Sequence, residues 1–250
     1  MAQNTYNAIF FDLDGTLLPM EVEDFLDRYF DTLGRFAASR GMEPATLCRA
    51  VGVSVGAMAS HEPGMVNADA FWTRFEQEWG QAGSAEEQFF NDFYGEAFDV
   101  IGKDVEVNPA AARAINTLLE KGYPLYLTTM PMFPREAVEA RLRWSGVNPS
   151  AFRYITCYDN STACKPSLEY FRENIQRVDV DPRRILMVGN NTEEDLIAMQ
   201  LGLDAYLVTD YLINPNEFDI ETVKHGSLAQ FAEFAESLPA CAAGKSVERM

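Results

Sequence analysis

Two aspartates near the start of the chain are the first residues whose types and spacing suggest chemistry. Asp12 and Asp14 directly follow the run Ala8–Phe11, and Gly15 comes next. The run is apolar on both faces, which is typical of a strand in a parallel sheet covered by helices. Residues i and i+2 of an extended chain point the same way, so we expect both carboxylates at the carboxyl end of this strand. Two hard oxygen ligands at that edge, where open α/β sheets bind ligands, predict a Mg²⁺ site.

Two further features fall where a predicted strand ends and where a predicted helix begins. A strand expected over residues 123–129 ends in Thr128 and Thr129, whose hydroxyls can hydrogen-bond a phosphate oxygen. Lys165 and Pro166 open a predicted helix, and a lysine adds a full charge to a helix N-terminus that already favours anions. Threonine is also a good strand former, and a surface lysine is usually solvated, so neither feature alone identifies a site.

The fourth feature is a tight turn after a strand predicted over residues 185–188. This turn contains Asn190 and Asn191 and leads into a helix predicted over residues 192–201, whose first turn is acidic. Acidic side chains in a first turn are ordinary partners of the helix dipole. The functional interpretation is that the turn supplies a third metal ligand, Asp195.

The elements that must position these residues divide the chain into two parts. From residue 105 onward predicted strands and helices alternate, which indicates a parallel sheet. Residues 19–104 show only helical patterns, rich in aromatic residues that we expect to form a core. We therefore predict an α/β fold, with a Rossmann-like sheet domain (residues 1–18 and 105–250) and an inserted all-helical domain (residues 19–104). The insert would form a lid over the aspartates, and residues 132–135 would line the entrance to the site.

Composition and charge exclude several classes of function. The chain has 250 residues, 47% of them hydrophobic, and a net charge of −18. Such a charge argues against a surface for nucleic acid or anionic membrane. The four cysteines form no C-x-x-C pair, and we find neither a signal peptide nor a membrane-spanning run. We expect a soluble, cytoplasmic protein, whose oligomeric state the sequence does not indicate.

Together the four features resemble the haloacid dehalogenase-like (HAD) hydrolase superfamily, in its phosphatase branch. The chain carries D-x-D-G-T-L after the first strand, then threonine, Lys-Pro and a Gly-x…Asp turn, in the order that is typical of the superfamily. The predicted helical insert between the first and second motifs is similar to the C1-type cap of some members. The resemblance covers the whole chain, and its first motif is the most specific.

The resemblance implies phosphoryl transfer. Asp12 would be the nucleophile and would form an aspartyl-phosphate. Asp14 would protonate the leaving oxygen and then activate the hydrolytic water. The Asp12 carboxylate, the Asp14 main-chain carbonyl and Asp195 would hold Mg²⁺, joined by Asn190 or Asn191.

The resemblance also implies which residues bind the phosphoryl group. Thr129 and Lys165 would hold its oxygens as charge builds on them, with Gly15 and Thr128 as further substrate-binding residues. We favour Thr129 over Thr128 because Thr129 is the last strand position before Met130.

Two departures from the family pattern bear on this interpretation. Met130 stands where members usually carry asparagine, and Asn190 or Asn191 stands where they usually carry an acid. An amide oxygen can ligate Mg²⁺ without contributing charge, so we expect weaker metal affinity.

The leading hypothesis is a Mg²⁺-dependent phosphatase acting on a small phosphorylated metabolite. A phosphomutase of the same fold and a non-catalytic HAD-fold binding protein are the alternatives; a dehalogenase is disfavoured because that chemistry does not need Asp14.

Overall fold

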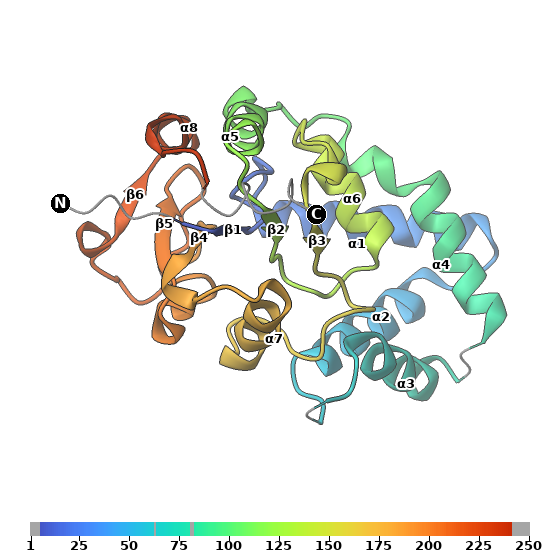
Figure 1. Cartoon of the computed structure of the whole chain (residues 1–250). Coiled ribbons are helices and arrows are strands. Elements are labelled where there is room, and N and C mark those ends of the chain that lie inside the picture. The colour runs from blue at the N-terminus through green and yellow to red at the C-terminus, as the bar shows by residue number, and fades with distance from the viewer. Residues whose placement is uncertain (1–5, 63, 81–82, 242–250) are drawn as a thin grey trace, which may run out of the picture.

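In the computed structural model, which describes residues 6–62, 64–80 and 83–241, a six-stranded parallel sheet forms the centre of the fold (Figure 1). The strand order is β3-β2-β1-β4-β5-β6, so β1 lies inside the sheet between β2 and β4. The strands are β1 Ala8–Phe11, β2 Leu125–Leu127, β3 Tyr154–Ile155, β4 Ile185–Gly189, β5 Asp204–Val208 and β6 Lys224–Gly226. The predicted α/β fold with a Rossmann-like parallel sheet is confirmed.

Eight α-helices accompany the sheet within the described ranges. Four lie between β1 and β2 in the chain and gather on one side of the sheet (Figure 1): α1 Val22–Ser39, α2 Pro44–Met58, α3 Asn67–Trp79 and α4 Ser84–Glu96. The others are α5 Pro109–Glu120, α6 Arg135–Trp144, α7 Leu168–Val178 and α8 Leu228–Ser237. No described residue between β1 and β2 forms a strand of the sheet, as the helical patterns predicted.

Strand β1 is buried from both faces of the sheet. Ile9 and Phe11 belong to the large apolar cluster that includes α5 and α8, where the Phe11 ring meets Phe231 edge-on at 5.7 Å. Ala8 and Phe10 point to the opposite face, into the cluster that contains residues of α7. This alternation explains why an uninterrupted apolar run can form a strand here.

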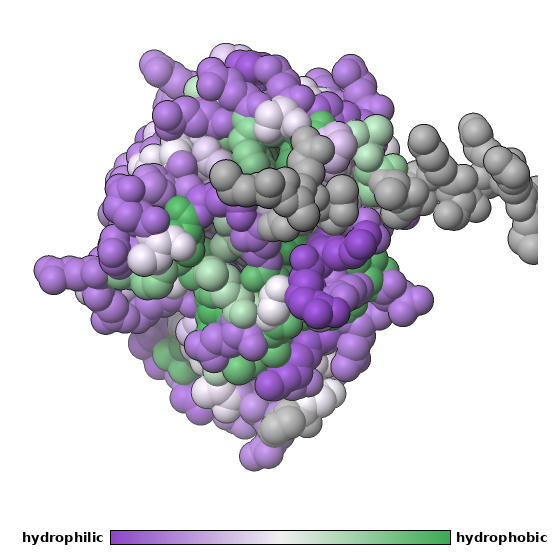
Figure 2. All heavy atoms as spheres, turned by 60° about the vertical axis from the view of Figure 1, so that its left-hand side comes forward, coloured by the Kyte–Doolittle hydropathy of each residue, from purple (hydrophilic) through white to green (hydrophobic). Residues whose placement is uncertain are grey.

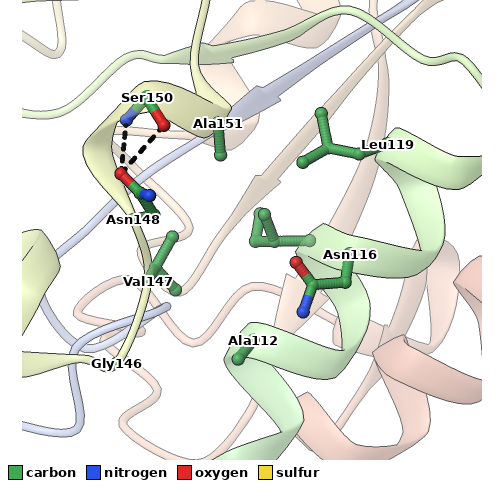
Figure 3. A pocket seen from close by; sticks show the side chains of 9 residues that line it. Ala112, Asn116, Leu119, Gly146, Val147, Asn148, Ser150 and Ala151 are labelled. Atoms are coloured by element: carbon green, nitrogen blue, oxygen red, sulfur yellow. Dashed lines mark hydrogen bonds between the residues drawn. The ribbon is translucent and has the colours of Figure 1, made fainter.

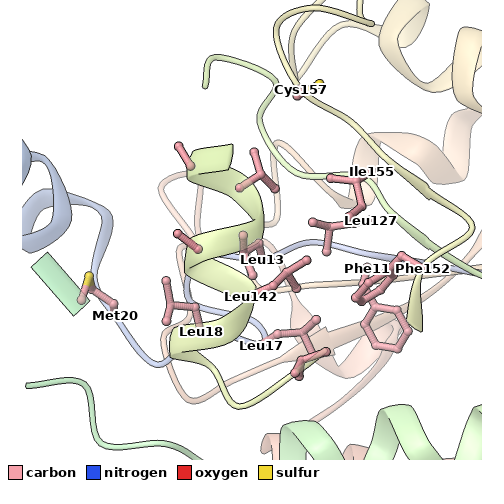
Figure 4. Packing of buried hydrophobic residues seen from close by; sticks show 14 of the residues in the cluster. Phe11, Leu13, Leu17, Leu18, Met20, Leu127, Leu142, Phe152, Ile155 and Cys157 are labelled. Atoms are coloured by element: carbon pink, nitrogen blue, oxygen red, sulfur yellow. The ribbon is translucent and has the colours of Figure 1, made fainter. Parts of the chain in front are cut away.

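The loop after β1 is fixed by its own apolar residues. Leu13, Leu17 and Leu18 are fully buried and belong to the same cluster as Leu142 of α6 (Figure 4). The Leu13 carbonyl also accepts hydrogen bonds from the amides of Thr16, Leu17 and Leu18, at 2.9–3.2 Å. The two aspartates therefore project from a loop that is held on both sides by the core.

The helix predicted over residues 192–201 is only partly correct. Residues 192–195 form turns, and a 3₁₀ helix follows at Leu196–Leu201. The cause is local: the Asn191 side-chain oxygen accepts hydrogen bonds from the amides of Glu193 and Glu194 at 2.9 and 3.2 Å. Asparagine side chains compete in this way with the regular helical pattern.

Some other boundaries also differ from the prediction. Helix α2 runs to Met58 through the small residues that follow residue 50. Helix α7 begins at Leu168 with Ser167 as its cap, and not at Pro166. Strand β6 was not predicted, because its three residues show no apolar pattern.

The aromatic residues of α3 and α4 form a core, as predicted. Phe75 and Phe93 are fully buried, and the Phe75 ring meets Phe90 edge-on at 5.6 Å. Asn67, fully buried at the start of α3, links this part to the sheet through a hydrogen bond from Nδ2 to the Pro131 carbonyl at 3.1 Å. The helical segment is thus packed within itself and attached to the loop after β2.

Hydrophilic residues make up most of the face that Figure 2 shows, with hydrophobic residues visible between them near its centre. Across the described ranges, none of the helices combines the length and the apolar character needed to cross a membrane.

Candidate active site

Most of the predicted site residues line one cavity at the carboxyl edge of the sheet, whereas Lys165, Gly15 and Thr128 are not among its lining residues. Asp12 follows β1, Thr129 follows β2 and Asp195 follows β4, and all three line a cavity of about 490 Å³ together with Asp14. Three sheet-end loops therefore bring these side chains together, as the positions of the motifs predicted.

Lys165 forms the link between two of the carboxylates. Its ammonium lies 2.8 Å from Asp12 Oδ1 and 2.6 Å from Asp195 Oδ1, and the lysine side chain has no exposed surface. Burial by itself would lower the pKa of Lys165, but the charges of Asp12 and Asp195 outweigh burial and raise it. Lys165 is therefore a fixed buried cation, and not a solvated surface lysine.

Asn190 joins the same group of side chains. Thr16 Oγ1 lies 3.2 Å from both Asp12 Oδ2 and Asn190 Oδ1. Asn190 Nδ2 donates a hydrogen bond to the Tyr211 carbonyl at 2.6 Å, which fixes the orientation of the amide with its oxygen facing the Thr16 hydroxyl. Asn191 also lines the cavity, but its side-chain oxygen is occupied by the two backbone amides of the following turn. The geometry thus favours Asn190 over Asn191 as a ligand.

Two glycines make room for these polar groups. Gly15 has a φ of +73°, and a Cβ atom there would lie 2.2 Å from Asn190 Nδ2. A Cβ atom on Gly189 would lie 2.1 Å from Asp195 Oδ2. The Gly15 amide donates to the Leu18 carbonyl at 2.9 Å, so in this structure Gly15 shapes the turn with its backbone.

The two threonines after β2 have different environments. Thr128 does not line the cavity; its hydroxyl lies 3.3 Å from the Phe11 carbonyl and 3.5 Å from Met187 Sδ. Thr129 does line the cavity, and its buried Oγ1 has no hydrogen-bond partner. An unpaired buried hydroxyl costs about 1–3 kcal/mol unless a ligand satisfies it. Of the two, Thr129 is in a position to contact a bound ligand.

Sequence reasoning missed Arg141, which lines the cavity from α6. Its Nη1 lies 2.5 Å from Asp14 Oδ2, its side chain is 2% exposed, and its guanidinium lies over the rings of Phe25 and Phe133. Arg141 is spaced three and four residues from the buried Val138 and Ala137. A charged residue on the apolar stripe of a helix was therefore the signal in the sequence.

The Asp14 carboxyl is asymmetric as a result. Oδ2 is held by Arg141, whereas Oδ1 is buried without a hydrogen-bond partner. Burial raises the pKa of Asp14, and the charge of Asp12 acts in the same direction, against the lowering effect of Arg141. A carboxyl group with a raised pKa and one free oxygen suits a general acid–base.

Glu194, one of the acidic residues just after the Asn190–Asn191 turn, also lines the cavity. Burial raises its pKa to about 7. Burial likewise raises the pKa of Asp195 to about 6, although Lys165 opposes the shift. The site thus concentrates acidic side chains that favour a cationic or protonated partner.

The donor set fits a hard divalent cation. Across the residues that the structure describes, no three acidic, histidine or cysteine side chains form a metal cluster by themselves. The available set is two carboxylates, Asp12 and Asp195, with the Asn190 amide oxygen, which lies near the same Thr16 hydroxyl as Asp12. Mg²⁺ characteristically takes one or two carboxylates and completes its shell with water and phosphate oxygens. The space that Gly15 and Gly189 leave for these ligands agrees with that fit.

A second hollow has no comparable chemistry. It lies between α5 and the segment after α6, where Ala112, Asn116, Leu119 and Val147 line it (Figure 3), and its volume is about 340 Å³. None of its described lining residues is charged, and none belongs to the four motifs.

Comparison with known proteins identifies the family of this chain. The model of the haloacid dehalogenase-like hydrolase family matches residues 6–201. That range contains all four motifs. The sequence has no significant match among curated proteins.

Solved structures of several hydrolases share the fold. A HAD phosphatase from Thermococcus onnurineus has a TM-score of 0.56 at 19% identity, with 93% of this chain and 99% of that chain covered. The HAD-hydrolase YfnB from Bacillus subtilis, bound to magnesium, has a TM-score of 0.55 at 20% identity, with 92% and 99% covered. L-2-haloacid dehalogenase from Xanthobacter autotrophicus has a TM-score of 0.51 at 12% identity, with 93% and 99% covered. At these identities the likeness shows the fold, which phosphatases and dehalogenases share.

Proposed function

Because this chain belongs to the haloacid dehalogenase-like hydrolase family, we propose that it is a Mg²⁺-dependent phosphatase acting on a small phosphorylated metabolite. The observation that carries the proposal is the state of Asp14. Its carboxyl group is buried beside Asp12, has a raised pKa and keeps one oxygen without a partner. Dehalogenation needs no such second acid, whereas release of an alcohol from a phosphate ester does.

The first half of the reaction transfers the phosphoryl group to Asp12. A carboxylate oxygen of Asp12 forms a bond to phosphorus while the bond from phosphorus to the alcohol oxygen breaks. Asp14 gives its proton to that departing oxygen, so the alcohol leaves neutral. The Thr129 hydroxyl and the Lys165 ammonium stabilise the charge that develops on the other phosphoryl oxygens.

The second half restores the enzyme. Asp14, now ionised, takes a proton from a water molecule, whose oxygen attacks phosphorus. The bond between phosphorus and Asp12 breaks, inorganic phosphate leaves, and Asp14 is protonated for the next cycle. Arg141 keeps Asp14 Oδ2 occupied, so Oδ1 is the oxygen that carries the proton in both steps.

In this proposal Asp12, Asp195, the Asn190 amide and the Asp14 main-chain carbonyl would hold Mg²⁺. A bound ion would supply positive charge against the phosphate and help to align the ester for attack. The magnesium-bound YfnB structure supports this choice of metal. We also propose that residues 19–104 act as a C1-type helical cap over a core of residues 1–18 and 105–250, because α1 and α2 contribute side chains to the cavity.

The proposal is tested by phosphate release from a panel of phosphorylated metabolites, with Mg²⁺ and with EDTA, for wild type and Asp12→Asn. We expect metal-dependent release that the substitution abolishes. The same incubations should include 2-chloropropionate with chloride detection, because chloride release without phosphate release would establish a dehalogenase instead. Phosphate movement within a sugar phosphate would favour the phosphomutase, and binding without turnover would favour the non-catalytic protein.

A further inference from the structure

The end of the cavity away from the sheet is walled by apolar side chains. Helix α1 contributes Phe25, Leu26, Tyr29 and Phe30, and α2 contributes Val55. From the loop before α6 comes Phe133, whose ring meets those of Phe25 and Tyr29 edge-on, each at 5.4 Å. We call these six residues the apolar wall. It faces the place where the alcohol part of a phosphate ester must lie once the phosphoryl group is at Asp12.

The apolar wall offers few partners for hydroxyl groups. The Tyr29 hydroxyl already lies 3.2 Å from the Tyr94 hydroxyl, within hydrogen-bonding distance. Among the described cavity residues of α1 and α2, Glu23 is the charged one, and it is an exposed anion. A sugar bound here would lose hydrogen bonds to water without replacing them.

The apolar wall also offers no site for a second anionic group. Among the described residues lining the cavity, Arg141 carries the one positive charge. Its Nη1 is bonded to Asp14 and its guanidinium lies over two aromatic rings, whereas its buried Nη2 has no hydrogen-bond partner. Arg141 thus belongs to the Asp14 side of the cavity and is not part of the apolar wall. None of the described arginines of the helical segment lines the cavity. Four form ion pairs elsewhere (Arg35 with Asp31, Arg40 with Glu96, Arg49 and Arg74 with Glu78), and Arg28 donates a hydrogen bond to the Ile101 carbonyl. The six residues of the apolar wall therefore include no cation for a bisphosphate or a carboxylated alcohol.

We propose that the alcohol part of the substrate is apolar, and specifically that this enzyme acts on phosphate monoesters of aryl or aralkyl alcohols in preference to sugar phosphates. The inference rests on the proposed phosphatase activity. Aromatic rings that present their edges and faces to a ligand favour another ring, in offset or edge-on contact. The cavity of about 490 Å³ falls in the usual range of about 300–1,000 Å³ for small-molecule sites.

The test compares kcat/KM for benzyl phosphate, glycerol 3-phosphate and glucose 6-phosphate, all with Mg²⁺. Acetyl phosphate, whose small acyl part hardly reaches the apolar wall, reports on the core chemistry alone. For wild type we expect kcat/KM for benzyl phosphate to exceed kcat/KM for both polar esters by at least about tenfold. Tenfold is about the smallest discrimination that one methylene group gives in an apolar pocket. Val55→Asp places a carboxylate in the apolar wall and should lower kcat/KM for benzyl phosphate by about tenfold or more. Val53→Asp is the matched control, since Val53 is on the same helix, 37% exposed and outside the cavity.

The outcomes separate this inference from the proposed function. Hydrolysis of acetyl phosphate, with benzyl phosphate no better than glucose 6-phosphate, would overturn the inference and leave the phosphatase standing. An equal effect of Val55→Asp and Val53→Asp on benzyl phosphate would also overturn it. Hydrolysis of none of the four compounds would refute both. The wild-type comparison decides the matter even if Val55→Asp does not fold.

Discussion

Replacing Arg141 with methionine should remove the group that holds Asp14 while keeping a long, flexible side chain in the same space. In the structure Nη1 is 2.5 Å from Asp14 Oδ2, the arginine side chain is 2% exposed and the Asp14 side chain is 15% exposed. The guanidinium also lies 4.6 Å from the centre of the Phe133 ring. The substitution therefore leaves a largely buried carboxylate without its partner.

The magnitude follows from that burial. Breaking a buried ion pair by removing one partner costs about 3–5 kcal/mol, because the remaining charge is uncompensated. The Asp14 side chain keeps 15% of its surface, and its raised pKa lets it take up a proton once Arg141 is gone, so we expect the lower end, about 3 kcal/mol. We also expect kcat to fall by about 10²-fold, because a general acid–base that is no longer held loses most of its contribution.

The assay is equilibrium unfolding in urea for four proteins: wild type, Arg141→Met, Asp14→Asn and the double variant. Asparagine removes the charge of Asp14 at nearly the same size. If the ion pair is real, the double variant should be more stable than the sum of the single effects predicts, by at least about 1.5 kcal/mol, as for a hydrogen bond to a charged group. Arg141→Lys serves as the control that keeps the charge without the planar guanidinium. Additive effects of the two single substitutions, or an Arg141→Met protein as stable as wild type, would refute this account of Asp14.

Three further predictions concern the sheet-edge loops. Gly189→Ala should lower kcat/KM by about 10²-fold, because its Cβ would lie 2.1 Å from Asp195 Oδ2 and displace that carboxylate; steady-state kinetics with saturating Mg²⁺ checks this. Asn190→Asp should lower the Mg²⁺ concentration needed for half-maximal activity, because it adds a negative charge, whereas Asn191→Asp should change that concentration less. The same half-maximal concentration in both variants and wild type would contradict the assignment of Asn190 as a metal ligand. Lys165→Met should abolish turnover. Mg²⁺ should raise the melting temperature of this variant more than that of wild type, because the two carboxylates that Lys165 bridges then lack a cation. Equal shifts in melting temperature would argue against a site that the metal and the lysine share.

The sequence was most informative where local pattern and tertiary environment agree. An apolar run with no polar face requires cover on both sides, so β1 and its place inside a parallel sheet were predictable from Ala8–Phe11 alone. The meeting of Asp12, Thr129 and Asp195 followed from the fact that parallel strands end at one edge. Their roles in the reaction stay predictions that the experiments above address.

The sequence was least informative where a side chain's partner comes from a distant element. The spacing of Arg141 from Ala137 and Val138 places it on the apolar stripe of α6, and it is buried, whereas Arg143 is exposed. The spacing does not indicate which groups surround the guanidinium. Those groups are Phe25 from α1, Phe133 and Asp14, which come together only when the chain has folded.

The turn after β4 shows a second kind of limit. The sequence left Asn190 and Asn191 as equal candidates, since they are adjacent and chemically identical. The structure separates them by their hydrogen bonds, because the Asn191 side chain caps the following turn and the Asn190 side chain faces Asp12 through Thr16. The same capping explains why residues 192–195 are not helical.

The most direct test of the central claim is to look for the phosphoryl group on Asp12. Wild type would be mixed with Mg²⁺ and acetyl phosphate, quenched in acid within the first turnover, and digested for mass spectrometry. We predict one added phosphoryl group on the peptide that contains Asp12, and none in Asp12→Asn. Turnover without a phosphorylated Asp12, or a phosphoryl group carried by another residue, would contradict the mechanism.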